Sequence, residues 1–89
     1  MAEEPIVSDH PERKRFELTV DGQTAFLKYE RANGALTLIH TEVPESLRGH
    51  HLGDALVKAA LAAGRAEGLR IVALCPFVRA YMRKHPIGG

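Results

Sequence analysis

Two dipeptides, Asp21-Gly22 and Asn33-Gly34, place the strongest constraint on the fold of this chain. Such pairs tolerate the positive φ angles that two-residue β-hairpin turns require. Residues 15–20 and 25–31 alternate apolar and polar side chains, and residues 36–43 are rich in Leu, Ile, Thr and Val. The sequence therefore predicts an antiparallel meander of three strands.

The second half of the chain predicts a long helix, a short strand and a final helix. Residues 54–67 carry apolar side chains at helical spacing, and Gly68 follows where a helix C-cap belongs. Residues 71–75 are almost wholly apolar, as in a strand that is buried on both faces, and Pro76 ends them. Residues 77–84 can form two turns of helix. The predicted order is β-β-β-α-β-α, an α/β (α+β) fold in which the last two strands lie parallel as a βαβ unit.

Length and composition limit the classes of protein that fit. The 89 residues suffice for one domain, expected over residues 13–89, after a flexible tail over residues 1–12 that carries two prolines and four acidic residues. A net charge of +1 gives no general attraction to nucleic acid or membranes, and one cysteine cannot form an internal disulfide. The N-terminus lacks a signal-peptide pattern, and no apolar run approaches membrane-spanning length. We therefore expect a cytoplasmic protein, a monomer or a weak homodimer.

The segment between the third strand and the long helix is the candidate binding site. Arg48-Gly49 and Leu52-Gly53 flank two histidines, in a loop that would leave the first backbone N–H groups of the helix unpaired. Those donors, the positive end of the helix dipole and Arg48 suit an anion such as a pyrophosphate. Asp54 could simply favour the helix start through its charge.

Three motifs together resemble the GCN5-related N-acetyltransferase (GNAT) superfamily, and more narrowly its small, single-domain, YjdJ-type acetyltransferase-like family. They are His40-Thr41-Glu42-Val43-Pro44, Arg48-Gly49-x-x-Leu52-Gly53, and Leu74-Cys75-Pro76-Phe77 followed by a tyrosine-containing helix and His85-Pro86. The resemblance covers about residues 16–86. It implies a minimal GNAT-like fold that binds acetyl-coenzyme A as a cosubstrate, with no metal. His51 stands where the loop of this family usually has glycine, so its imidazole could either approach the phosphates or weaken binding.

The resemblance also implies where the cofactor would lie. The third and fourth strands would separate, with Pro44 preventing ladder pairing, and the pantetheine arm would occupy the gap. The residues then expected to bind the cofactor are Val43, Arg48, Gly49, His50, His51, Leu52, Gly53 and Asp54.

Four residues are candidates for catalysis. His40 and Glu42 alternate to the same face of a strand and could take a proton from the incoming amine, although each alone could be a structural or solvated residue. Cys75 is a transient acyl acceptor, a polar group lining the site, or a small buried residue. Tyr81 matches the tyrosine that this family places near the leaving thiolate, as a general acid, or is an amphipathic core aromatic.

Two classes of function compete. The first is an enzyme that transfers an acetyl group from acetyl-coenzyme A to an unidentified amine, on a small molecule or a protein. The second is a non-catalytic coenzyme-A-binding or protein-interaction module, because the chain lacks the elements with which larger acetyltransferases build an acceptor pocket. No histidine or cysteine pair has metal-chelating spacing, and a Cys–His hydrolase would lack an oriented third group. Arg13-Lys14-Arg15 alone supports nucleic-acid binding; it is more typical of a solvated patch, or could help to hold the 3′-phosphate of the cofactor.

Overall fold

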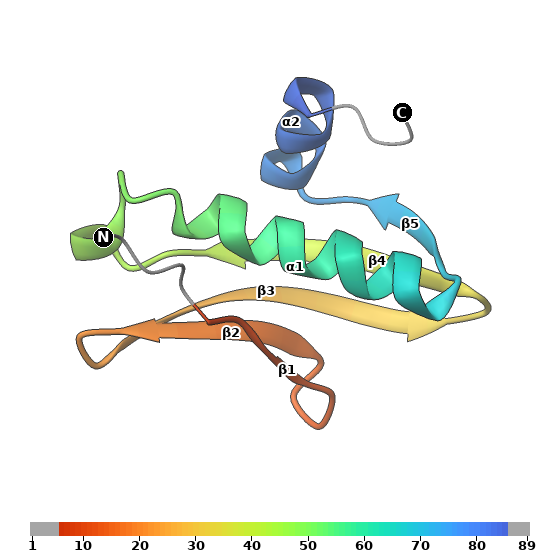
Figure 1. Ribbon diagram of the computed structural model, residues 1–89, viewed down its shortest axis with the longest axis horizontal. Helices are drawn as coiled ribbons and strands as arrows, with labels where there is room; N and C mark the ends of the chain where they lie inside the picture. The colour runs from red at the N-terminus through yellow and green to blue at the C-terminus, as the bar shows by residue number, and fades with distance from the viewer. Residues whose placement is uncertain (1–5, 86–89) are drawn as a thin grey trace.

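The computed structural model describes residues 6–85 and confirms a mixed α/β fold, a five-stranded sheet with two helices (Figure 1). The strands are β1 (Ser8–His10), β2 (Arg15–Val20), β3 (Gln23–Ala32), β4 (Ala35–Glu42) and β5 (Arg70–Ala73). The helical elements are the 3₁₀ turn η1 (Glu45–Leu47), α1 (Leu52–Glu67) and α2 (Pro76–Lys84). The strands lie in chain order, β1 to β4 antiparallel and β5 parallel to β4. The predicted meander and βαβ unit are therefore both present.

Both predicted hairpin turns occur at the predicted dipeptides. Asp21 and Gly22 have φ angles of 53° and 76°, and Asn33 and Gly34 have φ angles of 55° and 73°. Two successive positive φ angles match the right-handed twist of the strands that such a turn connects. The turns thus fix the pairing of β2 with β3 and of β3 with β4.

β1 was not predicted, and it lies inside the segment that was expected to be a flexible tail. Residues 8–10 of that segment pair with β2, whereas residues 1–5 lie outside the described part of the chain. Side chains distant in sequence also hold β1. The Tyr29 hydroxyl donates a hydrogen bond to the Asp9 carboxylate. The Arg31 guanidinium donates hydrogen bonds to Asp9, to the Tyr29 oxygen and to Glu67 at the end of α1. This network joins β1, β3 and α1.

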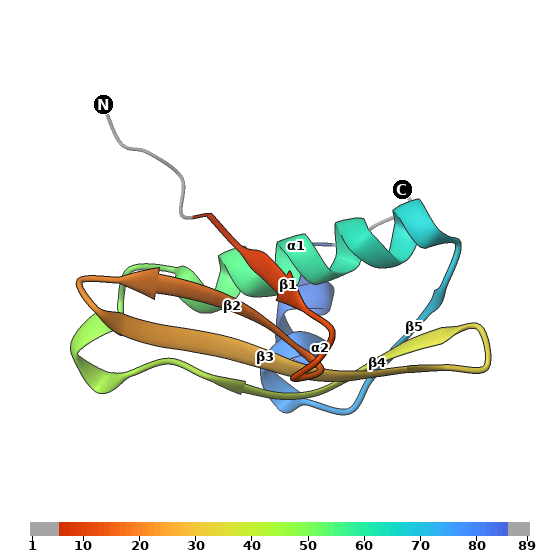
Figure 2. The same ribbon diagram turned by 90° about the horizontal axis from the view of Figure 1, so that it is seen from below.

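The core lies between one face of the sheet and α1 (Figure 2). α1 begins at Leu52, two residues earlier than predicted, and its buried side chains include Leu56, Val57, Ala60 and Leu61. It ends at Gly68, which has a φ of 72°, as a left-handed C-cap requires. The opposite face of the sheet carries mainly polar and charged side chains, so only one face contributes to the core.

β5 is an edge strand, so the expectation of a strand buried on both faces was wrong. Its apolar residues are only partly buried, and Leu74, which follows it, is 56% exposed. Within residues 6–85 no further strand pairs with its outer edge. The predicted final helix is present as α2, which contacts β4, β5 and α1.

Candidate functional site

The site is built where β4 and β5 separate, as the resemblance implied. The two strands pair only from Ala35 and Arg70 to Leu38 and Ala73. The Leu38 carbonyl oxygen then accepts hydrogen bonds from the N–H groups of Leu74, at 2.9 Å, and of Cys75, at 3.1 Å. Beyond that point β4 continues alone to Glu42 and leaves a gap beside it.

A β-bulge in β4 directs two polar side chains to the exposed face of the sheet. The register between β3 and β4 shifts by one residue at Ile39, which is the extra residue of the bulge. After the bulge, the side chains of His40 and Glu42 are 57% and 60% exposed, and the His40 Nε2 lies 3.1 Å from the Glu42 Oε1. A paired imidazole and carboxylate that both reach solvent can exchange a proton with a ligand.

The thiol of Cys75 lies behind Thr41, at the N-cap of α2. Its Sγ is 3.5 Å from the Thr41 Oγ1, and Cys75 is buried. Burial, the largest single influence, raises the pKa of this thiol, but the Thr41 hydroxyl and the backbone groups of Val78, Phe77 and Thr41 together outweigh burial. The pKa of Cys75 therefore lies below its ordinary value, and the thiolate is favoured.

The backbone of β4 borders the gap next to the thiol. A backbone group of Thr41 contributes to lowering the pKa of Cys75, so this part of β4 lies beside the Cys75 sulfur. Val43, two residues further along, lines the groove. β4 ends at Glu42, two residues before Pro44, close to the place where the sequence predicted its end.

The loop before α1 presents backbone N–H groups to the same region. Gly49 has a φ of 90°, which favours glycine, and the first helical bond runs from the N–H of Ala55 to the carbonyl of His51. The N–H groups of residues 52–54 therefore precede the first intrahelical bond. His51 has φ 61° and ψ 26°, the left-handed conformation that the family's glycine would adopt easily. Its side chain is 84% exposed, with Nδ1 3.6 Å from the Asp54 Oδ2.

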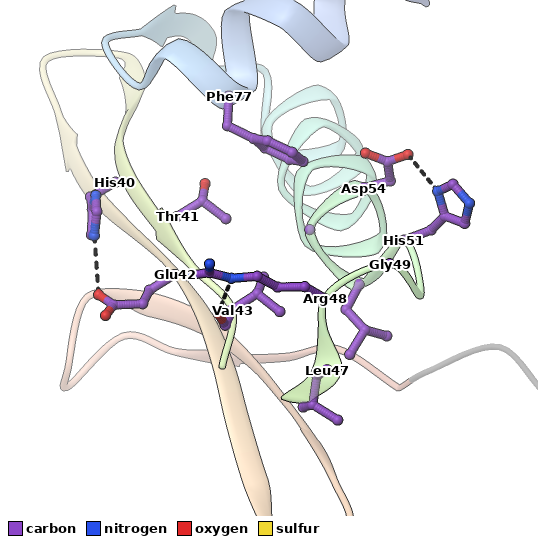
Figure 3. Close-up of a pocket in the computed structure, with 12 residues that line it drawn as sticks. His40, Thr41, Glu42, Val43, Leu47, Arg48, Gly49, His51, Asp54 and Phe77 are labelled. Atoms are coloured by element: carbon purple, nitrogen blue, oxygen red, sulfur yellow. Dashed lines mark hydrogen bonds and ion pairs between the residues drawn. The ribbon is translucent and has the colours of Figure 1, made fainter. Parts of the chain in front are cut away.

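A groove of about 550 Å³ joins the loop to the gap (Figure 3). The Arg48 side chain lies across it and donates a hydrogen bond from Nε to the Val43 carbonyl, at 3.2 Å. The ring of Phe77 projects into it from α2, between Thr41 and Asp54. The groove is lined by His40, Thr41, Glu42, Val43, Leu47, Arg48, Gly49, His51, Leu52, Gly53, Asp54 and Phe77.

Most of the predicted site residues meet in this groove, but three do not line it. His50 is exposed in the loop, and Cys75 lies behind Thr41. The Tyr81 ring stacks on His85, with 4.3 Å between the ring centroids. The nine predicted residues that line the groove are His40, Glu42, Val43, Arg48, Gly49, His51, Leu52, Gly53 and Asp54.

Three lining residues were not predicted: Thr41, Leu47 and Phe77. Thr41 stands between two predicted residues, so its place in the motif was a usable signal. Phe77 follows Cys75-Pro76 in another motif, but its contact with α1 is not visible in the sequence. A Cβ added to Gly53 would lie 2.7 Å from the Phe77 Cζ, so this ring rests directly on the first turn of α1.

The alternative sites considered from the sequence gain no support from the described residues. Residues 6–85 hold no group of three potential metal ligands and no helix with the length and hydropathy of a membrane span. In the basic run, Arg13 and Arg15 both pair with Glu17, and Lys14 pairs with Glu30. Each of the three cations therefore has a carboxylate partner, and the two carboxylates offset part of the positive charge of this run.

The separated strands and the groove at the start of α1 define an acetyltransferase-like α/β domain. The model of the GCN5-related N-acetyl-transferase family matches residues 15–87, and the chain belongs to this family. It is similar to the protein NATD1 of Homo sapiens, with 33% identity over 87 residues, 93% of this chain and 77% of that protein. NATD1 of Mus musculus is 32% identical over 93% of this chain and 79% of its own, and NATD1 of Danio rerio is 30% identical over 90% and 76%. The family resemblance drawn from the sequence is confirmed.

Proposed function

We propose that this protein is an acetyl-coenzyme-A-dependent N-acetyltransferase whose acceptor is an amine, carried by a small molecule or a protein. The observation that supports it best is the groove, because it joins the N–H groups at the start of α1 to the gap beside β4. Anion binding at one end and an open strand edge at the other suit an extended donor that has a pyrophosphate and an amide-containing arm. Membership of the acetyltransferase family supports the same assignment.

The residues present fit coenzyme A as a cosubstrate. Gly49, Gly53 and Arg48 would meet the pyrophosphate, while the N–H of Val43 would bind the pantetheine arm or the thioester carbonyl. Leu47 and Leu52 supply apolar surface for the arm. Asp54 adds a negative charge near the phosphates, which the neighbouring imidazole of His51 can offset when it is protonated.

The exposed pair of His40 and Glu42 is proposed as the base. It takes a proton from the incoming ammonium group, directly or through water. The amine nitrogen then bonds to the thioester carbonyl carbon, and the carbon–sulfur bond breaks. The nitrogen then loses its second proton, which the coenzyme A thiolate takes up, so that the products are the amide and the free thiol of coenzyme A. The N–H of Val43 would stabilise the negative charge that develops on the carbonyl oxygen.

Cys75 and Tyr81 are proposed in supporting roles. Cys75 is either a polar group beside the gap or a transient acceptor, in which case its sulfur forms a thioester and releases coenzyme A before the amine attacks. Its lowered pKa favours the second role, and its burial behind Thr41 favours the first. Tyr81 stands one turn after Phe77 on α2 and is the candidate acid for the leaving thiolate.

Titration with acetyl-coenzyme A and coenzyme A, followed by backbone amide shifts, tests the proposal. We expect shifts concentrated at Val43, residues 49–54 and residues 75–81. The variant Arg48→Ala should weaken binding, whereas Arg79→Ala, an exposed arginine of α2 outside the groove, should not. The absence of shifts at millimolar cofactor would refute the proposal.

The runner-up function is a non-catalytic coenzyme-A-binding or protein-interaction module. This alternative is supported by the position of Cys75 and Tyr81, because these two candidate catalytic residues do not line the groove. Tight binding without turnover of any amine would establish it instead of the enzyme. In that case Glu42→Gln and His40→Ala would leave the affinity for coenzyme A unchanged and no rate would be measurable in either variant or in the parent protein.

We also propose a cytoplasmic location, with no nucleic-acid or membrane partner and a monomeric or weakly dimeric state. The single cysteine, buried and free, suits a reducing compartment. Cell fractionation tests the location and the absence of a membrane partner, and sedimentation of the purified protein, alone and mixed with nucleic acid, tests the other two statements.

A further inference from the structure

Phe77 and Gly53 form a contact whose consequence goes beyond the proposed reaction. We propose that the ring of Phe77 limits the size of the acyl group that the groove accepts, and that residue 53 is glycine in order to seat this ring. The inference rests on the proposed binding of acyl-coenzyme A. It makes Phe77 a specificity-determining residue.

The position of Phe77 in the groove is the first observation. Eleven of the twelve lining residues come from the continuous segment 40–54, and Phe77 alone comes from α2. It stands two residues after Cys75, where β5 has ended and the gap beside β4 has opened. Its side chain, 42% exposed, projects into the groove and forms one wall of it between Thr41 of β4 and Asp54 of α1.

The backbone at Gly53 is the second observation. Gly49 needs glycine because its φ is 90°, but Gly53 lies within α1 and does not have a positive φ. Its Cα is instead covered by the ring: an added Cβ would lie 2.7 Å from the Cζ and 2.9 Å from the Cε2 of Phe77. Real Cβ atoms essentially never come so close to another heavy atom, so alanine at this position must push the ring away.

The two observations together predict a steric limit. The ring rests on α1 and cannot move further in that direction, because the helix backbone is already in contact with it. A longer acyl chain that reaches the gap beside Thr41 would have to displace the ring. In a tight apolar pocket one methylene group changes discrimination by about tenfold or more.

A cycle of four proteins tests the inference: the parent, Phe77→Ala, Gly53→Ala and the double variant. The readout is the affinity for acetyl-coenzyme A and butyryl-coenzyme A, measured by calorimetric titration. Because butyryl has two more methylene groups than acetyl, we expect the parent to favour acetyl by about a hundredfold, and Phe77→Ala to reduce this preference to less than about tenfold. Gly53→Ala should weaken binding of both donors by about tenfold when Phe77 is present and by less than about threefold when it is absent.

Two further variants serve as controls. Leu74→Ala removes an exposed apolar side chain close to Phe77 in sequence but outside the groove, and it should leave the preference unchanged. Phe77→Leu keeps an apolar contact with α1 but shortens the wall, so it should give an intermediate preference. Thermal unfolding of each variant shows that it is folded before its affinities are compared.

The possible results separate this inference from the proposed function. If Gly53→Ala weakened binding equally with and without Phe77, the glycine would be needed for phosphate binding and not for contact with the ring. If Phe77→Ala kept the preference for acetyl, the ring would not limit the size of the acyl group. Either result overturns the inference. Failure of the parent to bind either donor would overturn both proposals. Binding with the expected coupling but no turnover would defeat only the enzymatic activity.

Discussion

The left-handed conformation of His51 leads to a prediction about stability with an unusual sign. His51 precedes α1 with a φ of 61°, and its side chain is 84% exposed, with only the Asp54 carboxylate nearby. Replacing it by alanine or by glycine therefore removes almost the same contacts. The two variants differ in backbone preference alone.

The magnitude follows from that preference. The left-handed region costs an L-residue about 1–2 kcal/mol, and glycine enters it without that cost. Glycine loses more conformational entropy on folding, about 0.5–1 kcal/mol relative to alanine. His51→Gly should therefore be more stable than His51→Ala by about 0.5–1 kcal/mol, or a few degrees in Tm for a domain of this size.

Thermal unfolding by circular dichroism and calorimetry measures the difference. The matched control is Ala62→Gly at an exposed position inside α1, where glycine should lower the free energy of unfolding by about 1 kcal/mol. If His51→Ala were as stable as His51→Gly or more so, residue 51 would not be left-handed in solution and the reasoning would fail.

Three further predictions concern stability elsewhere in the molecule. The Arg13 hydrogen bond holds the pKa of Glu17 at about 2, so the parent should lose stability as the pH falls from about 4.5 to 2. Since Arg13 is half exposed, Glu17→Gln should lessen this loss by only about 1 kcal/mol. An acid unfolding profile that is the same in Glu17→Gln and in the parent would contradict the pairing. Burial, aided by Asp9, raises the pKa of Tyr29 to about 12, so stability should fall by about 2 kcal/mol as the pH rises from about 10 to 12. Tyr29→Phe should remove that part of the alkaline loss in chemical denaturation, and the prediction fails if both proteins lose stability equally. A Cβ on Gly64 would lie 2.6 Å from the Ile71 Cδ1, so the clash should offset the gain of about 1 kcal/mol that alanine has over glycine inside a helix. Gly64→Ala should therefore stabilise the Ile71→Val variant more than it stabilises the parent, and additive effects of the two substitutions would contradict the clash.

The elements that the sequence predicted are those that short-range chemistry determines. The Asp21-Gly22 and Asn33-Gly34 turns, the C-cap at Gly68 and the two helices depend on residues close to one another in the chain. β1 was not predicted because a strand of three residues is too short to show an alternation of apolar and polar side chains. It is held instead by Asp9 contacts with Tyr29 and Arg31, about twenty residues away. The edge position of β5 was not predicted because an apolar run does not show whether another strand pairs with it.

In the candidate site, too, features that depend on neighbouring residues could be predicted, and features that depend on long-range contacts could not. The loop from Arg48 to Asp54, which lines the groove, could be singled out from the sequence because its residues lie in one continuous segment. The bulge at Ile39, which directs His40 and Glu42 outward, arises from pairing with β3 and has no local signature. The wall formed by Phe77 depends on a contact between two helices. Long-range packing therefore accounts for what was missed.

The lengths of the strands bear on how the protein behaves when it is concentrated. The outer strands β1 and β5 have three and four residues, whereas the inner strands β2, β3 and β4 have six, ten and eight. An exposed strand edge offers unpaired N–H and C=O groups on which another chain can assemble, and a short edge offers few of them. The three longer strands lie inside the sheet, and β4 has an open edge only beyond Leu38, beside the groove. Because its longest strands lie inside the sheet and its edge strands are short, the fold should resist aggregation and domain swapping through strand pairing.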